Sequence, residues 1–404
     1  MRKMKDSGVE WIGTIPERWI TTKVKYFVEC LDGKRVPVDS SERNDGPYPY
    51  WGAGSITDYV DDYLFDEELI LLGEDGAPFF DKTRPVAFLI NEKVWVNNHI
   101  HVLKPFSTIN SKFLVYWLNN VDYKSYINGS ILNKLTQSNM NSISIALPNY
   151  EEQSCIVGFL DKETHEIDDA ISKTKQSIEE YKKLKRSVII KTVTKGLNPN
   201  AETKESGVEW IGRIPKEWNV IRFKFIHGIT NTGESIDKDF YSENEGETVF
   251  YMAGAAPIRT TYTEFPEWKY TTKSDLLLAR NGTPYVYLPK ERAAYSDHVI
   301  RVPIKKDYNK TFIRYALQQS IYSEMVEIVS IPTWSISVWG EQLLPMPSVA
   351  EQEEIVCYLN KKIGEYDSII SKKEQIIIEL EQYKESIIHE YITGKKEVLN
   401  GRNH

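Results

Sequence analysis

Short runs of alternating apolar and polar residues fill positions 20–147, and Gly, Pro, Asn and Asp separate the runs. Alternation with such breakers predicts β-strands, and the clearest are 68–73, 85–90, 94–96 and 142–147. One stretch has helical spacing instead, with apolar side chains at Phe113, Leu114, Trp117, Leu118 and Val121. The pattern therefore predicts a strand-rich α+β globule with few helices.

A period of seven residues replaces this alternation from about residue 150 and again from about residue 349. Asn149 with Glu152, and Ser348 with Glu351, supply an N-cap and an acid three residues later, which predicts that a helix begins at each point. Gly196 predicts the end of the first helix, and the second runs to about Gly394. A heptad seam can be written in both helices: Leu160, Ile167, Ile171, Ile178, Tyr181 and Val188, then Leu359, Ile363, Tyr366, Ile370, Ile377, Leu380 and Ile387.

The chain repeats itself. Residues 6–19 return as residues 205–218, with ten of the 14 positions identical. The same offset of 199 residues places Pro148, Glu152 and Gln153 on Pro347, Glu351 and Gln352. We therefore expect two copies of one module, with globules at 1–148 and 198–347 and helical segments at 149–197 and 348–404.

Each predicted helix is too long to stand alone. At 1.5 Å per residue a helix from 150 to 195 spans about 65 Å, and its apolar stripe needs a partner. We expect an antiparallel coiled coil of the two helices that separates the globules, with approximate two-fold symmetry. The alternative is that each stripe packs on its own globule, but repetition over about four heptads exceeds what a globule face requires.

Composition limits the partners without choosing among them. The net charge is -8, so any contact with DNA has to use a local basic cleft. No apolar run approaches the roughly 18 residues that span a bilayer, so we expect no membrane partner. The three cysteines, Cys30, Cys155 and Cys357, lack C-x-x-C spacing, which is typical of unpaired thiols in the cytoplasm.

No catalytic motif is apparent in the sequence. A P-loop pattern and a methyltransferase glycine-rich turn are missing, and the seven His residues lack metal-ligand spacing. His99 and His298 coincide under the repeat, but no nucleophile or paired carboxylate recurs with them, which favours a structural or DNA-contacting role over a general base. The acidic stretch 61–68 is typical of a solvated face rather than a nuclease site. We therefore expect no catalytic residue and no metal ligand on this chain.

Between the two copies the framework agrees and the loops differ. Loops on a rigid support commonly carry recognition, and Arg, Lys and Asn are the side chains that bind guanine, adenine and phosphate. Taken singly, each such residue fits an ordinary turn or surface position better than a DNA contact, whereas for the sets in corresponding loops the two interpretations are evenly matched. The candidate DNA-binding residues are Lys34, Arg35, Tyr48, Trp51, Lys82, Arg84, Asn97, Asn98, His99, Asn133 and Lys134 in the first copy, and Arg259, Arg280, Asn281, Tyr285, Arg292, His298, Arg301, Thr333 and Trp334 in the second.

The repeated opening S-G-V-E-W-I-G-x-I-P, and the P-N-Y-E-E-Q and P-S-V-A-E-Q segments that begin the helices, resemble the specificity subunit of Type I restriction–modification enzymes. The resemblance covers nearly the whole chain. It implies that the globules are target-recognition domains, each of which reads one half of a split double-stranded DNA sequence, and that the helices are the spacer between them.

The same resemblance implies that chemistry resides on partners. Two modification subunits would bring S-adenosylmethionine and methylate adenine, and restriction subunits would translocate and cleave the DNA, so we expect no cofactor on this chain. Two other interpretations stay open at this point: a fused enzyme with an unrecognised motif, and a coiled-coil adaptor that binds only protein.

Overall fold

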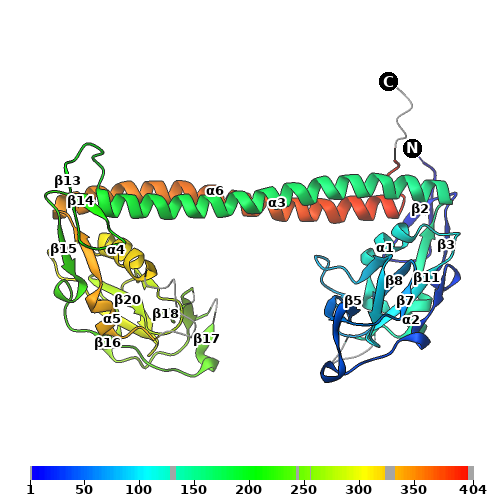
Figure 1. Ribbon diagram of the computed structural model, residues 1–404, viewed down its shortest axis with the longest axis horizontal. Coiled ribbons are helices and arrows are strands. Elements are labelled where there is room, and N and C mark those ends of the chain that lie inside the picture. The colour runs from blue at the N-terminus through cyan, green and yellow to red at the C-terminus, as the bar shows by residue number, and fades with distance from the viewer. Residues whose placement is uncertain (1, 128–132, 243–244, 255, 324–332, 399–404) are drawn as a thin grey trace. The chain divides into compact units, whose positions relative to one another are not determined.

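The computed structural model describes residues 2–127, 133–242, 245–254, 256–323 and 333–398. The chain divides into two compact units: unit 1 contains the residues up to Gln176 and those from Lys373 onward, and unit 2 runs from Ser177 to Lys372. Both divisions fall inside a helix, because α3 spans Tyr150–Lys195 and α6 spans Val349–Ile392. Each unit therefore contains the start of one long helix and the end of the other (Figure 1).

Unit 1 is built from short strands that form two small pairs and two larger sheets. The antiparallel pairs are β1 (Met4–Asp6) with β2 (Thr14–Pro16), and β3 (Ile20–Lys23) with β12 (Ser144–Leu147). One four-stranded sheet has the order β4 (Val28–Cys30), β11 (Ile100–Pro105), β8 (Leu69–Gly73) and β9 (Ala87–Ile90). The other has the order β6 (Ile56–Val60), β5 (Asp45–Trp51), β10 (Lys93–Val96) and β7 (Phe65–Asp66), and only β5 and β10 are parallel. The short helices of this unit are α1 (Ser111–Asn120) and α2 (Gln137–Ser142).

Unit 2 repeats the two small pairs and the first four-stranded sheet, and its second sheet differs at the edges: β7 has no counterpart among the described residues there, and β17 (Tyr241–Ser242) is added at the opposite edge. Its pairs are β13 (Thr203–Glu205) with β14 (Arg213–Pro215), and β15 (Asn219–Arg222) with β24 (Leu343–Met346). Its sheets are β16 (Asn231–Thr232), β23 (Val299–Pro303), β20 (Asp275–Ala279) and β21 (Val286–Tyr287), and then β17, β19 (Ile258–Thr260), β18 (Thr248–Tyr251) and β22 (Ala294–Tyr295). The short helices are α4 (Lys310–Ser323) and α5 (Ile336–Glu341). The α+β architecture predicted from the sequence is thus confirmed in both halves.

The central strand of each unit supports two cores at once. In β8 the side chains of Ile70 and Leu72 enter the core that contains α1, while Leu69 and Leu71 enter the core between the two four-stranded sheets. All five residues of β8 are buried. A strand covered on both faces is apolar at every position, which explains the continuous run in the sequence. In unit 2 the strand β20 divides its residues in the same way.

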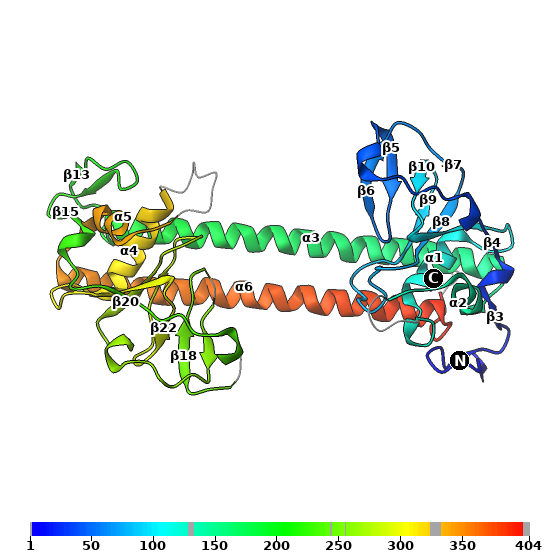
Figure 2. The ribbon, with the colours of Figure 1, turned by 90° about the horizontal axis from the view of Figure 1, so that it is seen from below.

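The long helices pack against each other in an antiparallel sense, as predicted. In unit 1 the two helices lie side by side (Figures 1 and 2). There Ile167 and Ile171 of α3 cluster with Ile387 of α6, and Asp168 accepts from Lys384 at 2.6 Å. In unit 2, the rings of Tyr181 and Tyr366 lie 6.1 Å apart, and Lys185 pairs with Asp367 at 2.5 Å. Seam positions nearer the helix ends enter the globular cores instead: Leu160 in unit 1, and Val188, Leu359 and Ile363 in unit 2.

The N-caps are used, but both acids take partners other than the expected amides, since the Glu152 carboxylate accepts from Arg2. Asn149 caps α3 by accepting from the Glu152 amide at 2.9 Å, and Ser348 caps α6 at 3.3 Å. The Glu351 carboxylate accepts from the indole nitrogen of Trp218 at 2.9 Å rather than closing the capping box. Trp218 is almost fully buried, and its N–H needs an acceptor there.

The helix ends dock on the repeated openings. Gly196 follows α3 with φ of 66°, and a Cβ added there would lie 3.1 Å from the Trp218 ring. Gly394 follows α6 with φ of 70°, and a Cβ there would lie 2.9 Å from the Trp19 ring. Both positions therefore need glycine for its backbone conformation and for its lack of a side chain.

The glutamine of each helix-opening segment is a structural tie. Gln153 is 1% exposed; its side chain accepts from the Asn110 amide at 2.8 Å and donates to the Pro148 carbonyl at 3.0 Å. Gln352 makes the same two contacts, with Asn309 at 2.8 Å and Pro347 at 3.0 Å. Each glutamine therefore joins the start of a long helix to the start of the short helix of its globule.

Replacing either glutamine by leucine should destabilise the unit that contains it. Gln153→Leu leaves the Asn110 N–H and the Pro148 carbonyl buried without partners, and we expect a loss of about 2–4 kcal/mol in the free energy of unfolding. Gln352→Leu should cost a similar amount in unit 2. Urea unfolding measures both, with Glu151→Gln, on the exposed first turn of α3, as the control. A loss below about 0.5 kcal/mol would show that the tie is not structural.

Candidate DNA interface

Three chain segments of unit 1 meet where β8 ends, and we call this place the corner of unit 1: residues 73–76, 98–100 and 133–135. The Glu74 amide donates to the His99 carbonyl at 3.0 Å, and the Leu135 amide donates to the Glu74 carbonyl at 2.7 Å. Asp75 and Lys134 form a β-bridge. Backbone hydrogen bonds therefore fix all three segments, although two of them are loops.

Unit 2 builds the same corner from residues 279–282, 297–299 and 333–335. The Arg280 amide donates to the His298 carbonyl at 2.9 Å, and the Trp334 amide donates to the Arg280 carbonyl at 2.6 Å. Asn281 and Thr333 form the equivalent β-bridge. The backbone of the corner is therefore repeated bond for bond.

The side chains on this common backbone differ. Glu74 and Asp75 in unit 1 correspond to Arg280 and Asn281 in unit 2, and Lys134 corresponds to Thr333. The histidine is common to both: His99 bonds the Asp75 carboxylate at 2.6 Å, and His298 bonds the Asn281 amide at 2.8 Å. The side chains of His99 and Lys134 are 51% and 48% exposed, so the corner faces solvent.

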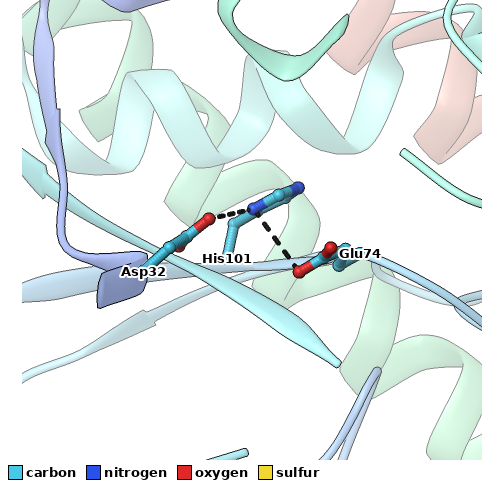
Figure 3. Close-up of side chains that lie close together, drawn as sticks. All are labelled: Asp32, Glu74 and His101. Carbon is cyan, nitrogen blue, oxygen red and sulfur yellow. Dashed lines mark hydrogen bonds and ion pairs between the residues drawn. The ribbon is translucent and has the colours of Figure 1, made fainter. Parts of the chain in front are cut away.

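A charged network lies beneath the corner of unit 1 (Figure 3). His101 is 1% exposed; its Nδ1 lies 2.6 Å from the Asp32 carboxylate and its Nε2 lies 2.8 Å from the Leu135 carbonyl. The Glu74 carboxylate is 3.9 Å from the same Nδ1. Arg35 donates to Glu74 at 2.6 Å and to the Ile100 carbonyl at 2.9 Å. The network therefore connects every segment of this corner.

Asp32, Glu74 and His101 also have the composition of a metal site, and their ligand atoms lie within 4.8 Å of one another. A metal ion needs a free lone pair on an imidazole nitrogen. In His101 a carbonyl oxygen and a carboxylate occupy the two nitrogens, while Arg35 and Lys134 neutralise Glu74. The arrangement fits a buried ion-pair network better than a metal centre.

The network also sets the acidity of Asp32. Burial would raise the pKa of its carboxyl group, but the hydrogen bond and charge of His101, the Val102 amide and the charge of Arg35 outweigh burial and lower the pKa. Asp32 is therefore ionised throughout the neutral range.

Several predicted DNA-binding residues lie at or beside the corners. They are Asn97, Asn98, His99, Asn133 and Lys134 in unit 1, and Arg280, Asn281, His298 and Thr333 in unit 2. Trp334 also belongs to the corner of unit 2 but is buried, and its indole donates to the Gly282 carbonyl at 2.7 Å. Their role in binding DNA stays a prediction.

Other predicted residues are held away from the corners or within ion pairs. Arg35 is in the buried network, Arg301 lies 3.8 Å from Asp275, and Arg292 pairs with Glu267 at 2.5 Å. Trp51 is buried against Phe88, and Tyr48 packs on Tyr63. Lys82 and Arg84 line a groove beside α6, and Tyr285 lines a pocket beside α3. Arg259 donates to the Gly246 carbonyl. Lys34 is exposed at the end of a 3-10 helix.

Glu74 and Asp75 are corner residues that the sequence analysis did not select. Their counterparts Arg280 and Asn281 lie 206 residues further on rather than 199, because the loops between the strands differ in length. Gly76 and Pro78 follow Asp75 at the same spacing as Gly282 and Pro284 follow Asn281. This shared pattern could have been used to align the two corner segments in the sequence.

Comparisons with known proteins agree with this architecture. The sequence model of a family described as "Type I restriction modification DNA specificity domain" matches residues 16–180. A putative type I restriction enzyme specificity subunit of Haemophilus influenzae is 31% identical over 158 residues, which are 39% of this chain and 38% of that protein. The MjaVIII specificity subunit of Methanocaldococcus jannaschii is 22% identical over 96% of this chain and 95% of its own length.

A solved structure also shares the fold. One chain of a type I restriction–modification system, determined to show complex assembly and conformational transition, superposes with a TM-score of 0.68 and 12% identity. The superposition covers 95% of this chain and 99% of that chain. Such low identity supports the fold alone.

The repeated corners and the paired long helices are thus found in a chain of which residues 16–180 match the Type I restriction modification DNA specificity domain. Over nearly its whole length the chain is similar to a Type I restriction enzyme specificity subunit, and it shares the fold of one chain of a type I restriction–modification system. In the described parts of the chain, no helix has both the length and the apolar composition needed to cross a bilayer. Cys30, Cys155 and Cys357 are unpaired.

Replacing Asp32 by asparagine should destabilise unit 1 and remove part of its acid sensitivity. The change removes the ionised acceptor that His101, the Val102 amide and Arg35 contact, and we expect a loss of about 3 kcal/mol at pH 7. Because the folded-state pKa of Asp32 is lowered, its contribution is complete above the ordinary aspartate pKa of about 4 and disappears as the pH falls below it.

Urea unfolding at pH 7, and at steps from pH 5 to pH 3, measures both effects. The wild-type advantage over Asp32→Asn should narrow as the pH falls through this range, and Glu92→Gln, an exposed change, should behave as wild type. An advantage that stays constant to pH 3 would contradict the assigned ion pair.

Proposed function

We propose that this chain reads a two-part DNA target, with the corner of unit 1 contacting one part and the corner of unit 2 contacting the other. The observation that carries the proposal is the repeated corner, in which the same backbone hydrogen bonds hold different side chains. A fixed backbone positions side chains to about the accuracy that base recognition needs.

The chemistry of the two corners suits different base pairs. Arg280 and Asn281 offer the donors and acceptors that bind guanine and adenine in the major groove, respectively. Unit 1 has Lys134 for guanine, Asn98 and Asn133 for adenine, and the Asp75 carboxylate as an acceptor for cytosine. The two parts of the target would therefore differ in sequence, and the full target would be asymmetric.

The helix pair would fix the distance between the two contacts. Its apolar seam and the ion pairs Lys384–Asp168 and Lys185–Asp367 hold the helices in register within each unit. A fixed register excludes sliding of one helix along the other by a heptad, so the number of unread base pairs would be constant.

The reaction itself would take place on partner subunits. By its family, the chain would assemble with two modification subunits, which bind S-adenosylmethionine and methylate adenine, and with restriction subunits that translocate and cleave DNA. It would hold no cofactor of its own and would act in the cytoplasm. Two features of the chain agree with a reaction on partner subunits. Its corners carry side chains suited to base recognition, and both ring nitrogens of its buried His101 are engaged in structural hydrogen bonds.

Selection of bound duplexes from a random library by the full-length chain tests the proposal. We expect a motif in two parts separated by a constant number of unread positions. Affinity should fall steeply with salt. A chain that serves only as a coiled-coil adaptor would return no motif and no steep dependence on salt, and that result would contradict the proposal.

Arg280→Ala should relax the motif in one part only. We expect a loss of about 1–3 kcal/mol of discrimination at one base position in the part read by unit 2, with the other part unchanged. Arg213→Ala is the matched control, because Arg213 is an exposed arginine of the same unit that lies outside the corner and is not a candidate DNA-binding residue. Equal relaxation of both parts, or of neither, would count against the assignment of Arg280.

A further inference from the structure

A pocket of about 630 Å³ lies in unit 2 beside the long helices. It lies within unit 2 only, between α3, α6, α4 and the loop that follows the corner. Its lining is cationic and aromatic: Lys182 and Arg186 of α3, Arg314 and Tyr322 of α4, and Tyr285 of the loop. Asp367 is also in the lining, but Lys185 already holds its carboxylate at 2.5 Å.

Among the described residues, two guanidinium groups of this pocket have no acidic partner. In the parts of the chain that the structure describes, no carboxylate oxygen lies within 4.0 Å of Arg186 or Arg314. Arg186 lies over the ring of Tyr322 at 5.4 Å, and Arg314 lies over the ring of Tyr315 at 5.0 Å. The Nε of Arg314 donates to the Val286 carbonyl at 3.3 Å. An arginine that stacks on a ring keeps its remaining edge N–H groups available for an anion.

The tyrosine hydroxyl groups add neutral donors. Burial raises the pKa of Tyr322, with a further contribution from Tyr285, and this exceeds the lowering caused by Arg186 and Arg314. The hydroxyl of Tyr322 therefore stays protonated and can donate to an anion. Arg, Lys and Tyr are the side chains with which proteins contact DNA phosphates.

The equivalent surface of unit 1 lacks both arginines. The inter-helix pair is retained, since Lys384–Asp168 corresponds to Lys185–Asp367. Arg186 corresponds to Glu385, and Arg314 corresponds to Val115. Lys82 faces this groove but donates to the Val121 carbonyl at 3.0 Å. The paired stacked arginines are therefore a feature of unit 2.

The pocket lies next to the corner of unit 2. Gln318 of α4 donates to the Pro284 carbonyl at 2.9 Å and accepts from the Val286 amide at 2.8 Å, which fixes the loop between them. Asn281 at the corner and Tyr285 at the pocket are four residues apart, a span of at most about 14 Å. The major groove is about 12 Å wide, so a phosphate that borders a base read at the corner would lie at this range.

We infer that Arg186 and Arg314 form a phosphate site, which binds the DNA backbone beside the bases that the corner of unit 2 reads. This inference rests on the proposed function. The contact would set the register of unit 2 on the duplex without selecting a sequence. It would also explain how a chain with a net charge of -8 attracts a polyanion, because the positive charge is concentrated where the backbone passes.

The salt dependence of DNA binding by the full-length chain tests this site. For Arg186→Ala with Arg314→Ala, we expect the slope of log affinity against log salt to become shallower by about 1. Between 50 and 200 mM salt, the fall in affinity would then be about fourfold smaller than for the wild type. The selected motif should stay unchanged in both of its parts.

Two variants control for charge and folding. Lys183→Ala removes one positive charge from the exposed surface of α3 outside the pocket, and it should keep the wild-type slope. Arg186→Lys retains the charge in the pocket and should restore most of the slope. Thermal unfolding of each variant establishes that unit 2 is folded.

The possible outcomes separate this inference from the proposed function. If the wild type binds DNA and the double variant keeps its slope, the phosphate site is wrong and the proposed function stands. If the double variant keeps its slope but no longer assembles with modification subunits, the pocket binds an acidic protein segment, and the inference is again wrong. If inorganic phosphate raises the thermal unfolding midpoint of the wild type while the slope is unchanged in the double variant, the pocket holds a free anion and not DNA. If the wild type shows no salt-dependent binding of DNA, both proposals fail.

Discussion

Each long helix has to complete two hydrophobic cores, one at either end, and the rest of the structure depends on this requirement. The start of α3 contributes Leu160 to the core of unit 1, and its end contributes Ile189 and Val193 to the core of unit 2. The start of α6 contributes Leu359 to unit 2, and its end contributes Ile392 to unit 1. Neither globule is complete with the residues that precede its own helix. Burial of the docked ends provides the free energy, and Gly196 and Gly394 provide the space that the two indoles need.

This requirement connects architecture to recognition. A helix whose two ends are anchored by Trp19 and Trp218 in separate cores has a fixed register in each of them, so the loops on each globule are built on a rigid support. The corners use that support in a modular way. Their backbone bonds repeat, whereas the side chains change from acidic Glu74 to basic Arg280 at the same position. Under the proposed function, exposed corner side chains such as those of His99 and Lys134 could change without changing the core, because backbone hydrogen bonds hold the segments that carry them.

Much of the fold was predictable from local patterns, and the reasons are physical. The continuous apolar run of β8 marks a strand covered on both faces, and the N-caps at Asn149 and Ser348 mark the true helix starts. The repeat identified Gln153 and Gln352 as equivalent, but only the coordinates show that their side chains tie two helices together. The acids three residues after the N-caps were the exception, because Arg2 binds Glu152 and the buried indole of Trp218 competes for Glu351.

The candidate site was less accessible to sequence reasoning. The sequence shows which residues are basic, but not which acids pair with them. Arg35, Arg292 and Arg301 were selected as DNA-binding candidates, yet each lies beside an acid that is distant in the sequence. His101 was not selected, because the His residues lack metal-ligand spacing, yet it is the centre of the network beneath one corner. The two stacked arginines of the unit 2 pocket, Arg186 and Arg314, illustrate the converse. Arg186 lies on a helix that the heptad pattern describes well, and nothing in that pattern shows that it faces Arg314.

Hydrogen exchange of the helix amides in wild type and in Trp218→Ala tests most directly whether each helix is shared between two cores. Removing this indole should weaken unit 2 and speed exchange in residues 177–195 and 349–372. Residues 150–176 and 373–392 should keep their wild-type protection, because they fold with unit 1. Faster exchange along the whole of α3 would contradict the account, since it would show that the helix unfolds as one element independent of the two cores.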